Sequence, residues 1–271
     1  MKAWRLLQTP ADSGAWNMAV DEAILEHIHR GTSKPTLRLF AWNPPCLSLG
    51  HAQSFKDVDV ERIRSLGWEV VRRLTGGRAI LHTDELTYSV AGTADDPVLA
   101  GGVLESYNRL SKALVHAIRA LNLPVEVKEH EGTPVAHNMN PICFEVPSTY
   151  EITVNGKKLI GSAQARRKEG VLQHGSLPLT GDLTRICDAL VFEDEPARQN
   201  AKDRLLARAT TVESVLGVET SWGRTAQVII QGFEAELGIR FESEELSNSE
   251  LKLADKLANE KYAHPDWTER N

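Results

Sequence analysis

Apolar residues recur along this chain with two periods, one typical of helices and one typical of strands. One helical stripe predicts a helix that begins after Asp12 or Ser13 as its N-cap. Its members lie four positions apart: Trp16, Val20, Ile24 and Ile28. A longer stripe predicts a helix over 103–121, and a short helix over 58–66 is expected to end at Gly67.

Short runs rich in β-branched and aromatic residues predict strands between and after these helices. They cover residues 3–8, 36–41, 46–49, 68–73, 86–90, 124–128, 149–154, 158–165 and 170–179. Asn155-Gly156, between two of them, predicts a type I′ hairpin. Segment 129–142 has no clear period and is predicted to be a long loop, which raises the expectation that it serves a site.

The C-terminal part is predicted to be helical. Thr210 and Glu213 fit a capping box, Ser221 can cap a helix that stops at Gly238, and a last helix is expected over 249–259. The order of elements predicts an α/β protein with a mixed β-sheet flanked by helices.

Bulk composition narrows the classes of partner. The 271 residues include 41% hydrophobic and 25% charged positions, as in ordinary globular proteins. A net charge of −6 makes general attraction to nucleic acid or to an anionic membrane unexpected. No run approaches the roughly 18 apolar residues of a membrane span, and the start lacks the core of a secretory signal. We therefore expect a cytoplasmic protein without nucleic-acid or membrane partners.

The chain has three cysteines, Cys46, Cys143 and Cys187, and no CxxC pair. A disulfide framework or a metal site is therefore not expected. Cys46 lies in a predicted apolar strand and Cys187 in a predicted helix, so both are expected in the core. Cys143 directly follows the irregular segment 129–142, a place suited to display, although a lone cysteine is most often a packing residue.

Lys158 lies 15 positions after Cys143, with a predicted hairpin that could bring the two into one cleft. A cysteine nucleophile beside a fixed cation suggests acyl transfer. Strand alternation would send Lys157 and Lys158 to opposite faces and Lys158 and Ile160 to the same face. Alternation does not say which face lines a pocket, and a solvated edge lysine is the common case.

A glycine turn follows the strand at 68–73. Gly76 and Gly77 let backbone N–H groups approach a ligand, but neither nucleotide-binding fingerprint is present. The turn could equally be a tight hairpin, although the neighbouring arginines favour a ligand. His82 and His174 are each as readily structural as catalytic.

Together these segments resemble the lipoate ligase, octanoyltransferase and biotin ligase superfamily over nearly the whole chain. The motifs that carry the resemblance are Pro44–Gly50, Arg72–Ala79, Lys158–Gln164 and His174–Gly175. The resemblance implies a biotin/lipoate protein ligase-like catalytic domain over 1–209, with 210–271 as a helical extension in the same structural unit. It also implies a set of substrate-binding residues: Arg73, Thr75, Gly76, Gly77, Arg78, His82, Gly161, Ser162, Ala163, His174 and Gly175.

Within the superfamily, the chain is most similar to the cysteine-dependent octanoyltransferases of Gram-positive type. Ligases typically have a third glycine where this chain has Arg78, and the Cys-Phe-x-x-Pro-Ser segment maps onto Cys143. The resemblance implies that Cys143 takes octanoyl from octanoyl-acyl carrier protein as a thioester. The acceptor would be a lysine of the glycine cleavage H protein or another lipoyl domain. Lys158 would hold Cys143 ionised and steady the carbonyl oxygen, with no cofactor and no metal.

Three other functions stay open on sequence grounds. An ATP-dependent lipoate–protein ligase would modify the acceptor from free acid and ATP. An octanoyl amidotransferase would prefer an octanoylated lipoyl domain as donor. A non-catalytic acyl-binding or carrier-binding protein would form no covalent adduct.

Overall fold

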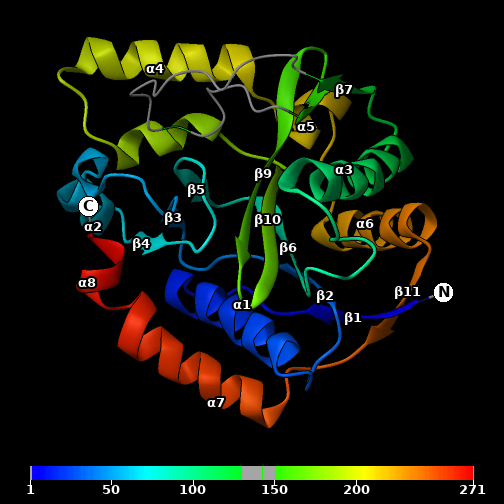
Figure 1. Cartoon of the computed structure of the whole chain (residues 1–271). Coiled ribbons are helices and arrows are strands. Elements are labelled where there is room, and N and C mark those ends of the chain that lie inside the picture. The colour runs from blue at the N-terminus through cyan, green and yellow to red at the C-terminus, as the bar shows by residue number, and fades with distance from the viewer. Residues whose placement is uncertain (1, 130–141, 143–149, 271) are drawn as a thin grey trace.

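The computed structural model describes residues 2–129, 142 and 150–270. Eight strands within these ranges form one mixed sheet in the order β11-β1-β2-β6-β10-β9-β8-β7 (Figure 1). The strands are β1 (Lys2–Gln8), β2 (Thr36–Phe40), β6 (Glu85–Gly92), β7 (Val125–Glu129), β8 (Tyr150–Val154), β9 (Lys157–Arg167), β10 (Gly170–Pro178) and β11 (Ile239–Ser243). β1 runs parallel to β11 and β2, and the other neighbours are antiparallel. The predicted mixed sheet is confirmed.

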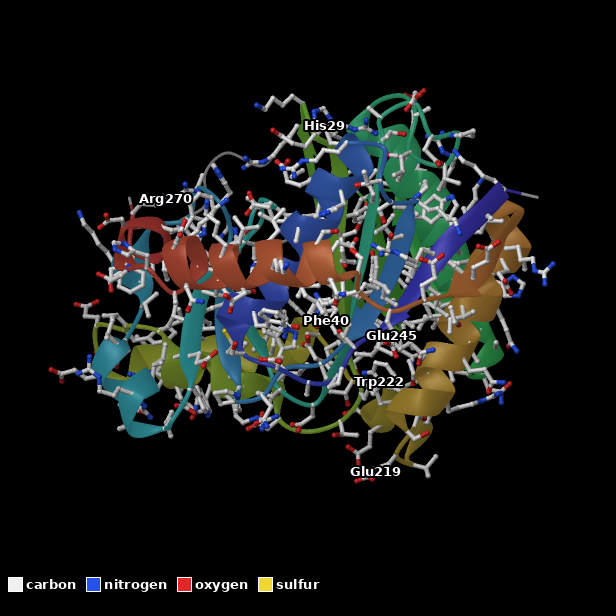
Figure 2. All side chains as sticks on the ribbon, turned by 90° about the horizontal axis from the view of Figure 1, so that it is seen from below. His29, Phe40, Glu219, Trp222, Glu245 and Arg270 are labelled. Carbon is white, nitrogen blue, oxygen red and sulfur yellow. The ribbon has the colours of Figure 1, made fainter. Side chains whose placement is uncertain are left out.

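Helices cover both faces of this sheet, as predicted. α3 (Val103–Ala120) and α6 (Trp222–Leu237) pack together on one face, where Leu114 and Phe233 are fully buried. α1 (Gly14–His29) covers the other face and is itself covered by α7 (Asn248–Leu257). Figure 2, seen from below, shows α7 crossing over α1. The His174–Gly175 motif thus lies in a strand enclosed by helices on both sides.

A second, three-stranded sheet has the order β4-β3-β5. It consists of β3 (Cys46–Leu49), β4 (Glu69–Arg72) and β5 (Ile80–His82). The helices that pack near it are η3 (Leu183–Ala189), α2 (Val60–Ser65) and α4 (Glu195–Arg208). Strand β5 was not predicted, because three residues after a glycine turn carry too short a pattern to recognise. The remaining short helical segments are η1 (Phe55–Asp57), α5 (Val212–Leu216), η4 (Ala258–Tyr262) and α8 (Pro265–Thr268).

The predicted helix ends are mostly confirmed. The Ser13 side chain accepts from the Trp16 backbone N–H at the start of α1, and Ser221 caps α6 in the same way. Gly238 ends α6 in the left-handed region with φ of 62°. Asn155 and Gly156 have φ of 51° and 74°, as a type I′ hairpin requires.

Two predictions for the C-terminal part are wrong. Thr211, not Thr210, caps α5 and accepts from the Ser214 N–H at 3.1 Å. The Thr210 N–H donates instead to the carbonyl of Lys158 at 3.1 Å. The region predicted to be helical also contains β11, which adds a parallel strand to the large sheet next to β1. The division at residue 209/210 stays a prediction.

Candidate active site

A pocket of about 380 Å³ lies between the two sheets and α1, and we call it the His174 pocket. Most of the predicted substrate-binding residues line it: Arg73, His82, Gly161, Ser162, Ala163, His174 and Gly175. Its other walls are Met18, Trp42, Ile80, Thr87 and Ser176. The Lys158–Gln164 and His174–Gly175 motifs meet here because the consecutive strands β9 and β10 pair, with Ala163 opposite His174.

The remaining predicted binding residues, in the glycine turn, lie beside this pocket rather than in its lining. Thr75 Oγ1 is 3.1 Å from His174 Nδ1. Gly77 has φ of 87°, a conformation that favours glycine, and a Cβ added there would lie 3.5 Å from that of Ala163. Arg73 Nη2 donates to the carbonyls of Gly76 and Arg78 at 2.8 and 3.0 Å. The turn is therefore fixed against the pocket wall.

A buried chain of polar groups forms one side of the pocket. Arg73 Nη1 donates to Ser48 Oγ at 2.8 Å, and Ser48 Oγ lies 2.6 Å from His82 Nε2. His82 Nδ1 is 2.5 Å from Glu85 Oε1. The ring of His82 stacks on Trp42 with centroids 4.0 Å apart. His82 is therefore held both by its ring nitrogens and by its face.

Glu85 anchors this chain as a buried carboxylate. Burial alone would raise the pKa of Glu85, but attraction to His82 and hydrogen bonds from His82, Ser176 and Thr87 outweigh it. The pKa of Glu85 is lowered as a result, so the carboxylate is ionised at neutral pH.

A second buried chain leads to His174 from the opposite side. His174 Nε2 lies 2.7 Å from Asp21 Oδ2, and Asp21 Oδ1 accepts from Arg38 Nη1 at 2.9 Å and from Ser89 Oγ at 2.8 Å. Burial would raise the pKa of Asp21, but the charge of Arg38 and the bond to His174 lower it overall. With His174 bonded to Thr75 as well, this chain connects α1 to the glycine turn.

These two chains explain why the pocket surface is almost entirely apolar although histidines, hydroxyls and an arginine line it. Their polar atoms are bonded to one another, and their carbon atoms face the space. The apolar surface of this pocket suits an unbranched alkyl chain.

Lys158 reaches the pocket side of the sheet through an irregularity in β9. Lys158 pairs with Thr153 and Ile160 pairs with Ile152, so Leu159 is an extra residue between them. Such a bulge places Lys158 and Ile160 on opposite faces, and the prediction that they share a face is wrong. Ile160 packs in the core under α3, whereas Lys158 shares the face of Gly161, is 5% exposed and lies outside the pocket lining.

The neighbouring Lys157 points to the surface, as the predicted alternation requires. Its Nζ donates to the carbonyl of Leu206 at the end of α4. The two lysines therefore differ in environment although they are adjacent in the chain.

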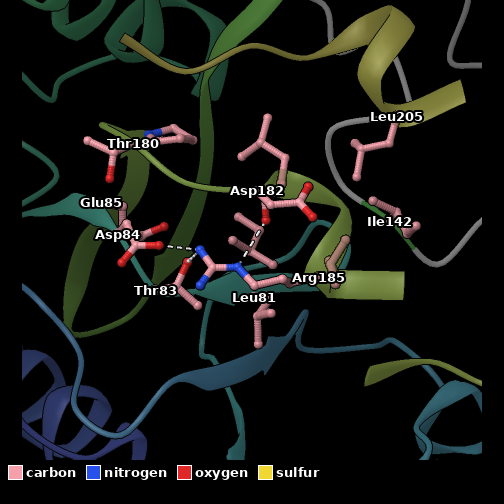
Figure 3. Close-up of a pocket in the computed structure, with 13 residues that line it drawn as sticks. Leu81, Thr83, Asp84, Glu85, Ile142, Thr180, Asp182, Arg185 and Leu205 are labelled. Atoms are coloured by element: carbon pink, nitrogen blue, oxygen red, sulfur yellow. Dashed lines mark hydrogen bonds and ion pairs between the residues drawn. The ribbon is translucent and has the colours of Figure 1, made fainter. Parts of the chain in front are cut away.

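Cys143, the predicted nucleophile, lies outside the described residues. The residue before it, Ile142, is 1% exposed and pairs with Ala79, directly after the glycine turn. Ile142 also lines a second pocket of about 460 Å³, the Arg185 pocket. Figure 3 shows this pocket, in which Arg185 bonds to Asp84 and to Thr83 Oγ1. Ile80 lines both pockets.

The other two cysteines are buried, as predicted. Burial, and secondarily the charge of Glu69, raises the pKa of Cys46 well above its ordinary value, so this thiol is not a nucleophile. Cys187 lies in η3 and is fully buried. We expect Cys46→Ala and Cys187→Ala to retain full activity and to lose about 1 kcal/mol or more in unfolding free energy. Urea unfolding and an activity assay on each variant check this, and a large loss of activity with unchanged stability would contradict it.

Sequence reasoning missed the role of Arg72, which faces away from Arg73. Arg72 is fully buried and donates to backbone carbonyls of two segments. Its acceptors are Gly50, Gln53, Thr268 and Arg270. Strand alternation between Arg72 and Arg73 was the available signal. Arg72 thus fastens the C-terminal tail beside the glycine turn.

No group of three or more His, Cys, Asp or Glu side chains suited to a metal ion occurs in the part of the chain that the structure describes. Within the same ranges, the helices are too short or too polar to cross a membrane.

Comparison with known proteins agrees with this geometry. The lipoyl protein ligase A/B catalytic domain matches residues 13–234. Octanoyltransferase LipM of Moorella thermoacetica is 40% identical over 270 residues, covering 99% of this chain and 98% of that protein. Octanoyltransferase LipM of Carboxydothermus hydrogenoformans is 38% identical, with 98% of each chain covered.

Solved structures of lipoate–protein ligases are also similar. The bipartite ligase of Thermoplasma acidophilum, studied with its E2 lipoyl domain, has a TM-score of 0.80 and 25% identity, covering 99% of this chain and 97% of that one. Lipoate–protein ligase A bound with ATP has a TM-score of 0.79 and 26% identity, covering 99% of both chains. The chain therefore belongs to the lipoyl protein ligase A/B catalytic domain family, and within it to the group that contains the LipM octanoyltransferases.

Proposed function

We propose that this acyltransferase moves an octanoyl group to a lysine of a lipoyl-domain protein through a thioester on Cys143. The observation that carries the proposal is the His174 pocket, an apolar chamber built by the family motifs and bordered by the face on which Lys158 lies. Its apolar surface fits an acyl chain better than a polar substrate.

The proposed reaction has two steps. The thiolate of Cys143 attacks the donor thioester, the carbon–sulfur bond to the donor breaks, and the donor thiol leaves. The amine of the acceptor lysine then attacks the acyl-cysteine thioester, loses a proton and becomes an amide, and the Cys143 thiol is restored. Lys158 stabilises the negative charge that develops on the carbonyl oxygen in both steps.

The resemblance to the octanoyltransferases suggests both partners. We propose octanoyl-acyl carrier protein as donor and the glycine cleavage H protein or another lipoyl domain as acceptor. The similarity to a ligase studied with its E2 lipoyl domain supports an acceptor of this class.

Single-turnover mass spectrometry tests the proposal. The full-length protein is mixed with octanoyl-acyl carrier protein, without ATP, and its mass is followed. We expect one octanoyl adduct that is absent in Cys143→Ala, retained in Cys46→Ala and Cys187→Ala, and transferred when H protein is added. No adduct, or an adduct that survives in Cys143→Ala, would refute the cysteine thioester.

A second candidate, an ATP-dependent ligase, is favoured by one observation, the likeness to a ligase bound with ATP. Octanoate, ATP and Mg²⁺ are supplied in place of the carrier thioester. Efficient modification of the acceptor under those conditions, and none from the thioester, would establish the ligase instead.

A further inference from the structure

The guanidinium of Arg78 has a buried donor without an acceptor in the part of the chain that the structure describes. Its Nη1 is buried, and among residues 2–129, 142 and 150–270 it has neither a hydrogen-bond acceptor nor an ion pair. The large majority of buried side-chain polar atoms in folded proteins are paired, so such an exception calls for an explanation. The position of Arg78 allows one explanation, which is that Nη1 donates to an oxygen atom of a ligand.

Contacts on both sides of Arg78 fix its backbone next to the site. Before it, Gly77 lies against Ala163 in the wall of the His174 pocket. After it, Ala79 pairs with Ile142, the residue that precedes Cys143 in the sequence. The carbonyl of Arg78 itself accepts from Arg73 Nη2 at 3.0 Å. The side chain therefore starts from a rigid point between the pocket and the proposed nucleophile segment.

Arg73, the other arginine of the turn that borders the pocket, uses its N–H groups in hydrogen bonds within the protein. Its Nη1 donates to Ser48, its Nη2 donates to the carbonyls of Gly76 and Arg78, and its Nε donates to Thr75 Oγ1 at 3.4 Å. Arg73 thus shapes the turn, and Arg78 is the arginine with a donor to offer a substrate.

We infer that Arg78 donates an N–H to the carbonyl oxygen of the transferred acyl group as negative charge develops on it. A guanidinium stays charged at every working pH and binds an anionic oxygen strongly. A preorganised donor stabilises the tetrahedral state more than the ground state, so it raises kcat rather than lowering KM. The proton stays on Arg78 throughout. This inference rests on the acyl transfer proposed above.

The test compares Arg78→Met with wild type, using octanoyl-pantetheine, a donor that carries no phosphate. We expect the rate of acyl-enzyme formation at saturating donor to fall about 100-fold, with little change in half-saturation. We expect Tm to be unchanged or higher, because the variant removes a buried donor without breaking a bond. Guanidinium ion added to Arg78→Ala should restore part of the rate.

Arg62→Met is the matched control, because Arg62 is also partly exposed but is paired with Asp188 at 2.9 Å. It should acylate at the wild-type rate. An Arg78→Met variant that acylates normally from octanoyl-pantetheine would overturn the inference, and a defect confined to a phosphate-bearing donor would reassign Arg78 to the phosphate. Failure of wild type to form any acyl-enzyme would instead refute the transfer proposal.

Discussion

Replacing Lys158 by alanine should reduce the rate of octanoyl transfer by about 10²–10³-fold, the cost of losing one donor to a developing oxyanion. Lys158 is buried, and the extra residue Leu159 turns it toward the face of the sheet where Gly161 and Ala163 line the His174 pocket. Its backbone carbonyl accepts from Thr210, so the strand position is held independently of the side chain. The fold should therefore survive the substitution.

Two companion variants separate charge from packing. Lys158→Met keeps the aliphatic stem and should lose activity as Lys158→Ala does. Lys157→Ala removes the neighbouring surface lysine, whose contact is the carbonyl of Leu206, and should stay near wild-type activity. Rates of acyl-enzyme formation and circular dichroism of all three provide the measurement. Turnover of Lys158→Ala close to that of wild type would remove Lys158 from the mechanism.

Local patterns predicted the elements that depend on local interactions. The four-residue spacing in α1, the Ser13 and Ser221 caps and the Asn155-Gly156 turn each depend on residues a few positions apart. Such interactions are readable from the sequence because the partners lie within one turn of chain. The Thr210 error has the same origin, since two adjacent threonines offer equivalent caps and Lys158, distant in sequence, decides between them.

The features that the sequence patterns did not predict depend on pairing between strands. The bulge at Leu159 arises from the register between β8 and β9, and it puts Lys158 and Ile160 on opposite faces, where simple alternation puts them on the same face. Strand β11 is stabilised by pairing with β1, in which Lys2 lies opposite Ile239. The two strands are more than 230 positions apart in the sequence. A window of a dozen residues contains neither partner, so periodicity cannot reveal these features.

The family motifs predicted the residues around the pocket but not the groups that hold them. His82 and His174 belong to motifs, whereas Glu85 and Asp21, which orient them, carry no signal beyond a carboxylate inside an apolar run. A charged residue on the buried side of a predicted helix or strand is nevertheless informative, because an isolated buried carboxylate is costly. Asp21, next to Val20 in α1, could have been flagged on that ground.

Replacing Asp21 by asparagine should destabilise the protein by about 3–5 kcal/mol, among the largest effects expected from one substitution. Arg38 is fully buried. Among the described residues, Asp21 is the residue with which it forms an ion pair. The asparagine leaves that guanidinium buried without its counter-charge and removes a partner of His174. Urea unfolding at neutral pH measures the loss. Asp203→Asn, on the exposed side of α4, is the control and should change stability by less than about 0.5 kcal/mol.

Lowering the pH should reduce the difference in unfolding free energy between wild type and Asp21→Asn. The pKa of Asp21 is lowered in the folded protein from 3.8, because attraction to Arg38 and the bond to His174 outweigh burial, so at low pH the unfolded chain binds this proton first. The stabilisation is thus fully present above about pH 4 and is lost as pH falls through the lower folded pKa. Asparagine has no carboxylate to protonate, so the unfolding free energy of Asp21→Asn lacks this pH dependence. The difference between the unfolding free energies of the two proteins should therefore become smaller as the pH falls from about 6 to about 3. A constant difference over that range would mean that Asp21 stabilises the fold by packing and neutral hydrogen bonds rather than by its charge.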